Sequence, residues 1–206
     1  SLPYVSSTSD TRFLLGPTYA LLRKEFRNSA NRSVENRVRE VLVAMGGADG
    51  RNLTPTVLKF LDDLEGDFKV TAIIGPFVKN KDEVAEVAKH CRRQVAMVRD
   101  PEHMWDLMRR ADVAISAGGQ TLYELAATGT PTVAVQVADN QAGNVRCFSQ
   151  YGTVTPVVFD SLEQLRGALA DPVQALMADQ QLRERMSQAG SRLVDGFGTQ
   201  RVGEAL

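Results

Sequence analysis

Short apolar runs alternate with amphipathic segments along most of this chain, and this alternation constrains the fold more than any other feature. Short apolar runs are typical of strands buried on both faces, and the amphipathic segments are typical of helices that cover a parallel sheet. Strands are predicted at residues 41–45, 70–74, 94–98, 113–116, 132–137 and 154–159. Helices are predicted at residues 53–65, 81–93, 101–111, 120–129, 140–152 and 161–170, with Asp100 and Ser161 as helix caps. The sequence therefore predicts an α/β fold, a Rossmann-like six-stranded parallel sheet with helices on both faces.

The two ends of the chain do not follow this pattern. Residues 1–39 lack the alternation, and the last part is mostly helical, with Gly196 and Gly198 marking a break before a final short helix. The stretch from Arg23 to Arg39 is locally basic, and we interpret it as a solvated linker rather than a binding patch. Three parts are expected: residues 1–39, 40–190 and 191–206.

Composition limits the function classes. With 206 residues, 43% of them hydrophobic and 24% charged, the chain can bury one core as a soluble globular protein. The formal net charge of -1 provides no general attraction to nucleic acid or acidic membranes. No apolar run reaches the length of about 18 residues that suggests a membrane span, and the first residues do not resemble a signal peptide. Together with only two cysteines, Cys91 and Cys147, this predicts a cytoplasmic protein without membrane insertion or a nucleic-acid partner.

The loop after the first predicted strand reads GGADGRN. Ligands of open α/β sheets bind where loops leave the carboxyl ends of the strands, so this loop is a candidate site. Gly46 and Gly47 allow a phosphate to approach the main chain, and the following helix start is expected to offer unpaired N–H groups. An ordinary turn with Asp49 and Gly50 at its corner is the alternative.

The loop after the fourth predicted strand reads AGGQTLYE. Gly118 and Gly119 precede Gln120 and Thr121 at a predicted helix start. Glu124 lies one helical turn further on, where its carboxylate can accept hydrogen bonds from ribose hydroxyls. The alternative for Glu124 is a solvent-facing residue that interacts favourably with the helix dipole.

The loop after the fifth predicted strand reads ADNQ. Asp139, Asn140 and Gln141 suit sugar hydroxyls or an amide, although a cap and turn is the alternative. Because all three loops fall at the same edge of one parallel sheet, contacts to phosphate, ribose and sugar are expected to lie side by side.

Other nucleotide-binding motifs are absent from the sequence. A dinucleotide site needs G-x-G-x-x-G after the first strand and an acid at the end of the second, which here continues as AIIGPF. No G-x-x-x-x-G-K-[ST] motif occurs, and the histidines and cysteines form no metal-ligand set. A hydride-transferring enzyme is therefore disfavoured, and neither a cofactor nor a metal is expected.

Four segments resemble a known family: LLGPTYALLRKEF, VLVAMGGADGRNLT, DLMRRADVAISAGGQTLYELAATGTPTVAVQVADNQ and DGFGTQRVGEAL. They are similar, over nearly the whole chain, to the UDP-sugar hydrolase of the pseudaminic acid pathway and to the related spore-coat polysaccharide proteins. A more distant resemblance is to the peptidoglycan N-acetylglucosaminyl transferase, which has the GT-B architecture of two facing Rossmann-like domains. The resemblance implies that residues 1–39 are an interdomain segment and that residues 40–190 are the C-terminal nucleotide-binding half of a GT-B protein. Residues 191–206 would pack back toward the N-terminal domain.

The resemblance also implies a reaction, in which water attacks the anomeric carbon of a UDP-linked 2,4-diacetamido-2,4,6-trideoxy sugar and UDP leaves. The uracil would contact the loop at residues 98–104, and Glu124 would hold the ribose. The diphosphate would meet the amides of Gly46, Gly47 and Gly119 and the Thr121 hydroxyl. Asn140, the one catalytic candidate in this chain, and Gln141 would face the sugar. Gln120 stands where many relatives have serine.

The chain departs from that family in one respect. The N-terminal domain of the family carries a G-x-G-H motif whose histidine is taken as the base, and neither His90 nor His103 follows a Gly-x-Gly. We therefore expect a half-enzyme that binds a UDP-sugar and needs the N-terminal GT-B domain for hydrolysis. A glycosyltransferase domain and a noncatalytic nucleotide-sugar-binding module remain as alternatives. Apolar residues at both chain ends are expected to permit a weak homodimer.

Overall fold

The computed structural model describes residues 12–27 and 32–206 and contains one parallel sheet of six strands, in the order β3-β2-β1-β4-β5-β6. The strands are Glu40–Ala44 (β1), Lys69–Ile74 (β2), Val95–Arg99 (β3), Val113–Ala117 (β4), Thr132–Val135 (β5) and Val154–Val157 (β6). This is the strand order of doubly wound nucleotide-binding folds, in which the winding reverses between β1 and β4. The predicted sheet is confirmed, although β5 and β6 end earlier than expected.

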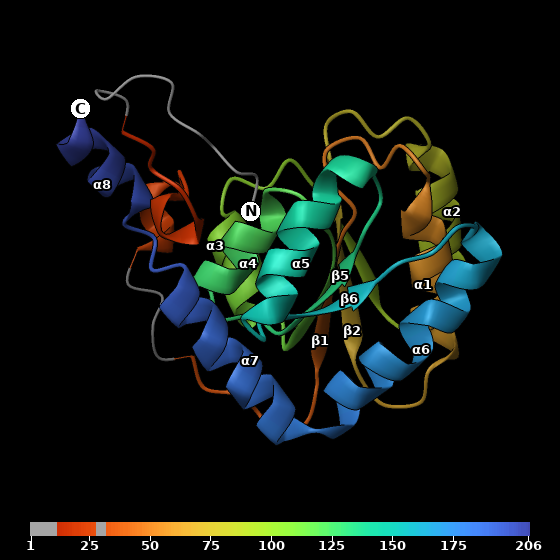
Figure 1. The fold of residues 1–206 in the computed structure, drawn as a ribbon. Coiled ribbons are helices and arrows are strands. Elements are labelled where there is room, and N and C mark those ends of the chain that lie inside the picture. The colour runs from red at the N-terminus through yellow and green to blue at the C-terminus, as the bar shows by residue number, and fades with distance from the viewer. Residues whose placement is uncertain (1–11, 28–31) are drawn as a thin grey trace.

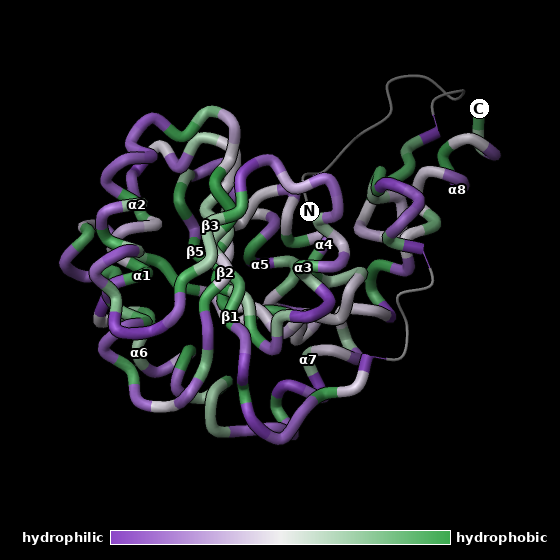
Figure 2. Tube along the Cα trace, turned by 180° about the vertical axis from the view of Figure 1, so that it is seen from behind, coloured by the Kyte–Doolittle hydropathy of each residue, from purple (hydrophilic) through white to green (hydrophobic). Residues whose placement is uncertain are grey.

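The central strands are apolar because both of their faces are covered. All residues of β1, β4 and β5 are buried. Val41 of β1 pairs with Val70 of β2 on one side and with Val113 of β4 on the other. Figure 2 shows hydrophobic residues concentrated along the strands at the centre and hydrophilic residues in many of the outer loops. Burial of continuous apolar strands therefore accounts for the layered fold.

The helices form two layers, one on each face of the sheet (Figure 1). One layer contains α1 (Leu53–Asp63), α2 (Lys81–His90) and α6 (Leu162–Ala178). The other contains α3 (Met104–Arg110), α4 (Thr121–Ala127) and α5 (Ala142–Gln150), and α7 (Gln180–Leu193) packs on α4. The remaining elements are α8 (Gly198–Ala205) and the 3-10 turns η1 (Pro17–Tyr19), η2 (Lys24–Phe26) and η3 (Asp139–Gln141). Within the described ranges, no helix combines the length and the apolar character that crossing a bilayer requires.

The two predicted helix caps have different outcomes. Ser161 is confirmed, because its hydroxyl accepts a hydrogen bond of 3.3 Å from the backbone N–H of Gln164. The cap predicted at Asp100 is wrong, since α3 begins only after His103, and Asp100 has a positive φ of 43° in the preceding loop. The helix after Ser161 is also longer than predicted. It continues through Pro172, because apolar residues at helical spacing are fully buried on both sides of that proline.

The basic stretch from Arg23 to Arg39 is not a solvated linker throughout, so that interpretation is wrong for Arg32. The Arg32 guanidinium is buried and donates hydrogen bonds to the carbonyl oxygens of Arg109, at 2.9 Å, and Ala111. Burial lowers the pKa of Arg32 to about 10, and Asp112 at 4.0 Å opposes that shift. Arg32 therefore fixes the segment before β1 to the α3 end of the domain.

Residues 12–27 pack against the C-terminal end of the chain, as Figure 1 shows beside α8. Phe26 and Leu22 are buried in the same apolar cluster as Val194. The predicted break at Gly196 and Gly198 is confirmed, and a Cβ at either position would collide with backbone atoms of the N-terminal segment. The assignment of residues 1–39 as an interdomain segment stays a prediction, and residues 1–11 and 28–31 lie outside the described ranges.

Candidate functional site

A cavity of about 250 Å³ lies at the carboxyl ends of the strands, beside the point where the winding of the sheet reverses. The loops after β1, β2 and β3 line it together with the start of α4 and one side chain from the N-terminal segment. Its lining includes Arg23, Gly46, Gly47, Gly75, Asp100, Pro101, Thr121 and Glu124. Ligands of open α/β sheets bind at this position. The cavity, called the carboxyl-edge pocket from here on, is therefore the candidate site.

Glycines bring the first two loops of this pocket into contact. Gly46 has a φ of 85°, which disfavours any other residue. A Cβ on Gly75 would overlap the carbonyl group of Gly47, and the backbone N–H of Phe77 donates to that same carbonyl oxygen at 3.0 Å. The wall next to β1 is consequently bare main chain, as the glycine-rich sequence predicts.

The start of α1 differs from what the sequence suggests. The carboxylate of Asp49 accepts hydrogen bonds from the backbone N–H groups of Leu53, at 2.8 Å, and Thr54, at 2.9 Å. The expectation of unpaired N–H groups at this helix start is therefore wrong for these two residues. A negatively charged side chain already occupies the position that an anion would take, so a phosphate has to use other donors.

Such donors remain at the start of α4. The Gly118 amide is taken, because it donates to Val135 O at 3.0 Å and to Gln141 Oε1 at 3.1 Å. A Cβ on Gly118 would also overlap Val145 of α5, so this glycine is required for packing. Within the described ranges, the backbone amides of Gly119, Gln120 and Thr121 have no acceptor. The Thr121 side of this helix start lines the pocket.

Glu124, in the first turn of α4, contributes a carboxylate to the pocket lining. Its side chain is only 19% exposed, and its nearest cation is Arg23, whose Nη2 lies 3.8 Å from Oε1. Burial raises the pKa of Glu124, Arg23 opposes this shift, and Glu25 reinforces it. No donor within the described ranges forms a hydrogen bond with this carboxylate, so its oxygens are open to hydroxyl groups of a ligand.

The remaining predicted residues lie at the same edge but outside the pocket lining. Gln141 Oε1 also accepts a bond of 3.1 Å from the Val137 N–H, and its Nε2 lies 3.8 Å from the position of a Cβ on Gly119. Asn140, on η3, and Gln120 are exposed. The pocket thus gathers some of the predicted residues and leaves others at its α4 and η3 side. Those in its lining are Gly46, Gly47, Thr121 and Glu124; those outside are Gly118, Gly119, Gln120, Asn140 and Gln141.

Arg23 is a charged pocket residue that the sequence does not identify. It belongs to the stretch interpreted as a linker, and η2 follows it directly. Its guanidinium lies 3.3 Å from Glu25 and 5.6 Å from the centre of the Phe26 ring. The alternation of apolar and polar segments carries no signal for this residue, because the chain brings Arg23 and Glu124 together only in the tertiary structure.

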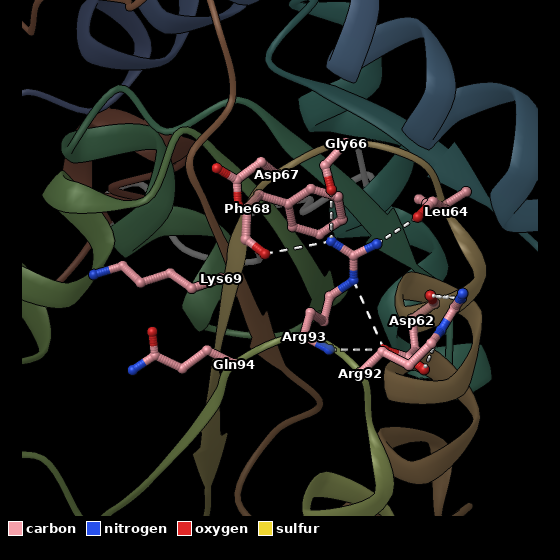
Figure 3. A pocket seen from close by; sticks show the side chains of 9 residues that line it. All are labelled: Asp62, Leu64, Gly66, Asp67, Phe68, Lys69, Arg92, Arg93 and Gln94. Carbon is pink, nitrogen blue, oxygen red and sulfur yellow. Dashed lines mark hydrogen bonds and ion pairs between the residues drawn. The ribbon is translucent and has the colours of Figure 1, made fainter.

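A larger cavity, of about 470 Å³, lies at the opposite, amino ends of β2 and β3 (Figure 3). Arg93 lines this cavity. The Arg93 guanidinium donates hydrogen bonds to the carbonyl oxygens of Gly66, at 3.1 Å, Phe68, at 3.3 Å, and Leu64. The same group stacks on the Phe68 ring at 3.8 Å. These bonds tie the turn after α1 to the sheet, and the guanidinium is therefore explained by the fold.

The strand order and the pocket together define a Rossmann-like domain with a pocket at the switch point of the sheet, where ligands of such folds bind. The chain belongs to the family described as Glycosyltransferase family 28 C-terminal domain, which matches residues 41–197. It is 28% identical to the spore coat polysaccharide biosynthesis protein SpsG of Bacillus subtilis over 196 residues. These residues cover 94% of this chain and 57% of SpsG.

A second relative is a Helicobacter pylori protein named pseudaminic acid cytidylyltransferase and UDP-2,4-diacetamido-2,4,6-trideoxy-beta-L-altropyranose hydrolase. It is 28% identical over 150 residues, which cover 72% of this chain and 26% of that protein. Among solved structures, Acinetobacter baumannii MurG superposes with a TM-score of 0.66 and 18% identity, covering 85% of this chain and 53% of MurG. The chain thus spans about a quarter to somewhat over half of these proteins. The predicted C-terminal half of a GT-B architecture is confirmed as the fold.

Proposed function

We propose that this chain binds the uridine diphosphate part of a nucleotide sugar in the carboxyl-edge pocket. The observation that carries the proposal is Glu124, a mostly buried carboxylate that lines the pocket and lacks a hydrogen-bond donor from the described protein. A ribose offers two neighbouring hydroxyls, which can donate to such a group. Membership of the glycosyltransferase family supports the assignment, and the names of two relatives refer to sugar polymers or UDP-sugars.

The pocket suggests a place for each part of the ligand. Pro101 and the rest of the loop at residues 98–104 would contact the uracil ring, and Glu124 would accept the ribose hydroxyls. Bare main chain at Gly46 and Gly47, the amide of Gly119 and the hydroxyl of Thr121 would surround the diphosphate. The occupied start of α1 shifts the diphosphate toward the α4 side in this proposal. Gln141 Nε2 and exposed Asn140 would then face the sugar.

For the complete protein we infer hydrolysis of a UDP-linked 2,4-diacetamido-2,4,6-trideoxy sugar. This chain would stabilise the charge that develops on the leaving UDP, and an N-terminal GT-B domain would supply the base that activates water. Asn140 would position the reacting centre. The resemblance of the quoted segments and the hydrolase named in the Helicobacter pylori relative support this choice. Transfer of the sugar to an acceptor is the second candidate, which the glycosyltransferase family favours.

Two measurements test the proposal in order. Titration calorimetry of the 206-residue chain should show binding of UDP with little discrimination against UDP-sugars, since the pocket is expected to contact mainly the nucleotide. A folded sample that binds no UDP at millimolar concentration would overturn the proposed site. Product analysis with the chain joined to its N-terminal domain then separates the reactions: free sugar indicates hydrolysis, and sugar attached to an acceptor indicates transfer.

A further inference from the structure

Arg23 lies at the pocket and is held by two carboxylates. Its Nη2 is 3.8 Å from Glu124 and 3.3 Å from Glu25, and its guanidinium lies 5.6 Å from the Phe26 ring centre. The side chain is 51% exposed, whereas that of Glu124 is 19% exposed. Ion pairs at this distance with a half-exposed arginine are weak. Arg23 therefore forms a long ion pair with Glu124 and no hydrogen bond, a contact that a ligand can displace.

The proposed ribose contact competes with this ion pair. Ribose hydroxyls would use the Glu124 carboxylate, whose Oε1 Arg23 approaches to 3.8 Å. A nucleoside that displaces Arg23 leaves the guanidinium with Glu25 alone. A nucleoside diphosphate brings its own anionic group into the pocket, where a guanidinium can form bidentate, charge-assisted hydrogen bonds.

We propose that Arg23 is an exchangeable partner of Glu124, which leaves the carboxylate when ribose binds and turns to the diphosphate of the same ligand. The proposal rests on the proposed function, because it takes the carboxyl-edge pocket as the UDP site. It makes Arg23 a specificity-determining residue that couples recognition of ribose to recognition of phosphate. Arg23 then disfavours uridine, which has to displace it from Glu124, and favours UDP, whose diphosphate it can bind.

Opposite effects of one substitution test this exchange. In Arg23→Gln, Glu124 is free before ligand arrives, so the Kd of uridine should fall by about two- to fivefold, the range that an exposed ion pair covers. The same variant lacks the guanidinium for the diphosphate, so the Kd of UDP should rise by about tenfold. Lys24→Gln is the matched control, because it removes a neighbouring exposed cation that does not line the pocket. It should leave both constants unchanged.

Glu25→Gln provides a second, independent variant. It removes the other carboxylate beside Arg23, so Arg23 should remain closer to Glu124 and the Kd of uridine should rise. Calorimetry for UDP, NMR titration for uridine and a thermal melt for each variant give the comparison.

The outcomes separate this proposal from the assignment of the pocket. If the parent chain binds UDP and Arg23→Gln leaves both Kd values unchanged, or shifts them in the same direction, the exchange is overturned and the UDP site stands. If the folded parent binds neither ligand, the pocket assignment fails and the exchange fails with it.

Discussion

Acidic side chains at the two edges of the sheet differ in what they contact: two at the amino edge are hydrogen-bonded to the protein, whereas Glu124 at the carboxyl edge is not. At the amino edge, the Asp112 carboxylate accepts from the backbone N–H groups of Arg39, at 2.7 Å, and Glu40, at 3.0 Å. The Glu40 carboxylate in turn accepts from the Thr71 hydroxyl at 2.7 Å and pairs with Lys69 at 3.0 Å. At the carboxyl edge, Glu124 has only a distant, half-exposed arginine.

We interpret the amino edge as contributing to stability and the carboxyl edge as available for binding. A buried polar group that is fully paired helps to specify the fold, and one left without a partner costs stability unless a ligand satisfies it. The amino edge thus fixes the strands and the segment before β1. At the carboxyl edge, the Glu124 carboxylate and the amides of Gly119, Gln120 and Thr121 have no hydrogen-bond partner within the described ranges, and glycine backbone lines the pocket.

The largest expected effect comes from breaking the amino edge at Arg183. Its fully buried guanidinium donates to the carbonyl oxygens of Leu176, at 2.6 Å, Glu35, at 2.7 Å, and Asn36, at 2.9 Å. Arg183→Met leaves these carbonyls without a donor, so the free energy of unfolding should fall by roughly 2 to 5 kcal/mol. Urea denaturation measures it.

A control on the same helix keeps this test specific. Arg185 is mostly exposed and makes only a 3.9 Å contact with Asp179, so Arg185→Met should change the free energy of unfolding by less than about 1 kcal/mol. Equal losses in the two variants would contradict the role assigned to the buried guanidinium. In the folded fraction of Arg183→Met, the affinity for UDP should be unchanged.

The next effect concerns the carboxyl edge. Glu124→Gln keeps the size of the side chain and removes its charge, so UDP binding should weaken by roughly 1.5 to 3 kcal/mol as charge-assisted bonds to ribose are lost. The free energy of unfolding should not decrease, because the native protein leaves this carboxylate without a hydrogen bond. Calorimetry and urea denaturation on the same samples measure both quantities. Unchanged UDP affinity would leave Glu124 as an ordinary helix residue.

The pH dependence of the same carboxylate sharpens the comparison. The pKa of Glu124 is raised by burial, with Arg23 opposing. A carboxyl whose pKa is higher in the folded protein binds its proton more tightly there, so its ionisation opposes folding. This cost is present in full above the folded pKa and disappears as the pH falls through that value to the unfolded one.

Two readouts follow from this sign. The gain in unfolding free energy of Glu124→Gln over the parent should be largest near neutral pH and shrink as the medium is acidified. The UDP affinity of the parent should fall over the same interval, because a protonated carboxyl is a poorer acceptor for ribose. UDP also titrates, so the ratio of parent to variant affinities at each pH isolates Glu124. A ratio independent of pH would refute the coupling.

The sequence predicts the sheet and part of the candidate pocket for physical reasons. Strands buried on both faces have to be apolar, so β1 and β4 are visible in the sequence. Glu124 can be predicted because a helix start follows a strand and a glycine pair, which places the first helical turn at the carboxyl edge of the sheet. These features depend on local spacing alone.

Other features depend on contacts between distant parts of the chain. Arg23 and Arg32 lie in one basic stretch, yet one lines the pocket and the other is buried against α3. The cap formed by Asp49 depends on a positive φ of 41°, which is uncommon for aspartate and which the residue types do not reveal. Composition of a short stretch cannot distinguish such environments, since they are set by what the rest of the chain packs against it.

The smallest expected effect concerns the chain ends, which belong to neither edge. Leu22, Phe26 and Val194 are already buried within this chain, whereas Leu21 is 63% and Leu206 fully exposed. Burying a leucine contributes about 1.5 to 3 kcal/mol, and association costs at least about 4 kcal/mol, so two leucines per copy support only weak dimers. We therefore expect self-association near millimolar concentration, measured by light scattering across a concentration series.

The double variant Leu21→Gln, Leu206→Gln should stay monomeric with unchanged UDP affinity, and adding the N-terminal domain in cis should abolish the association. Dimers that persist in the double variant would place the contact on another surface and leave the ends without a role in association.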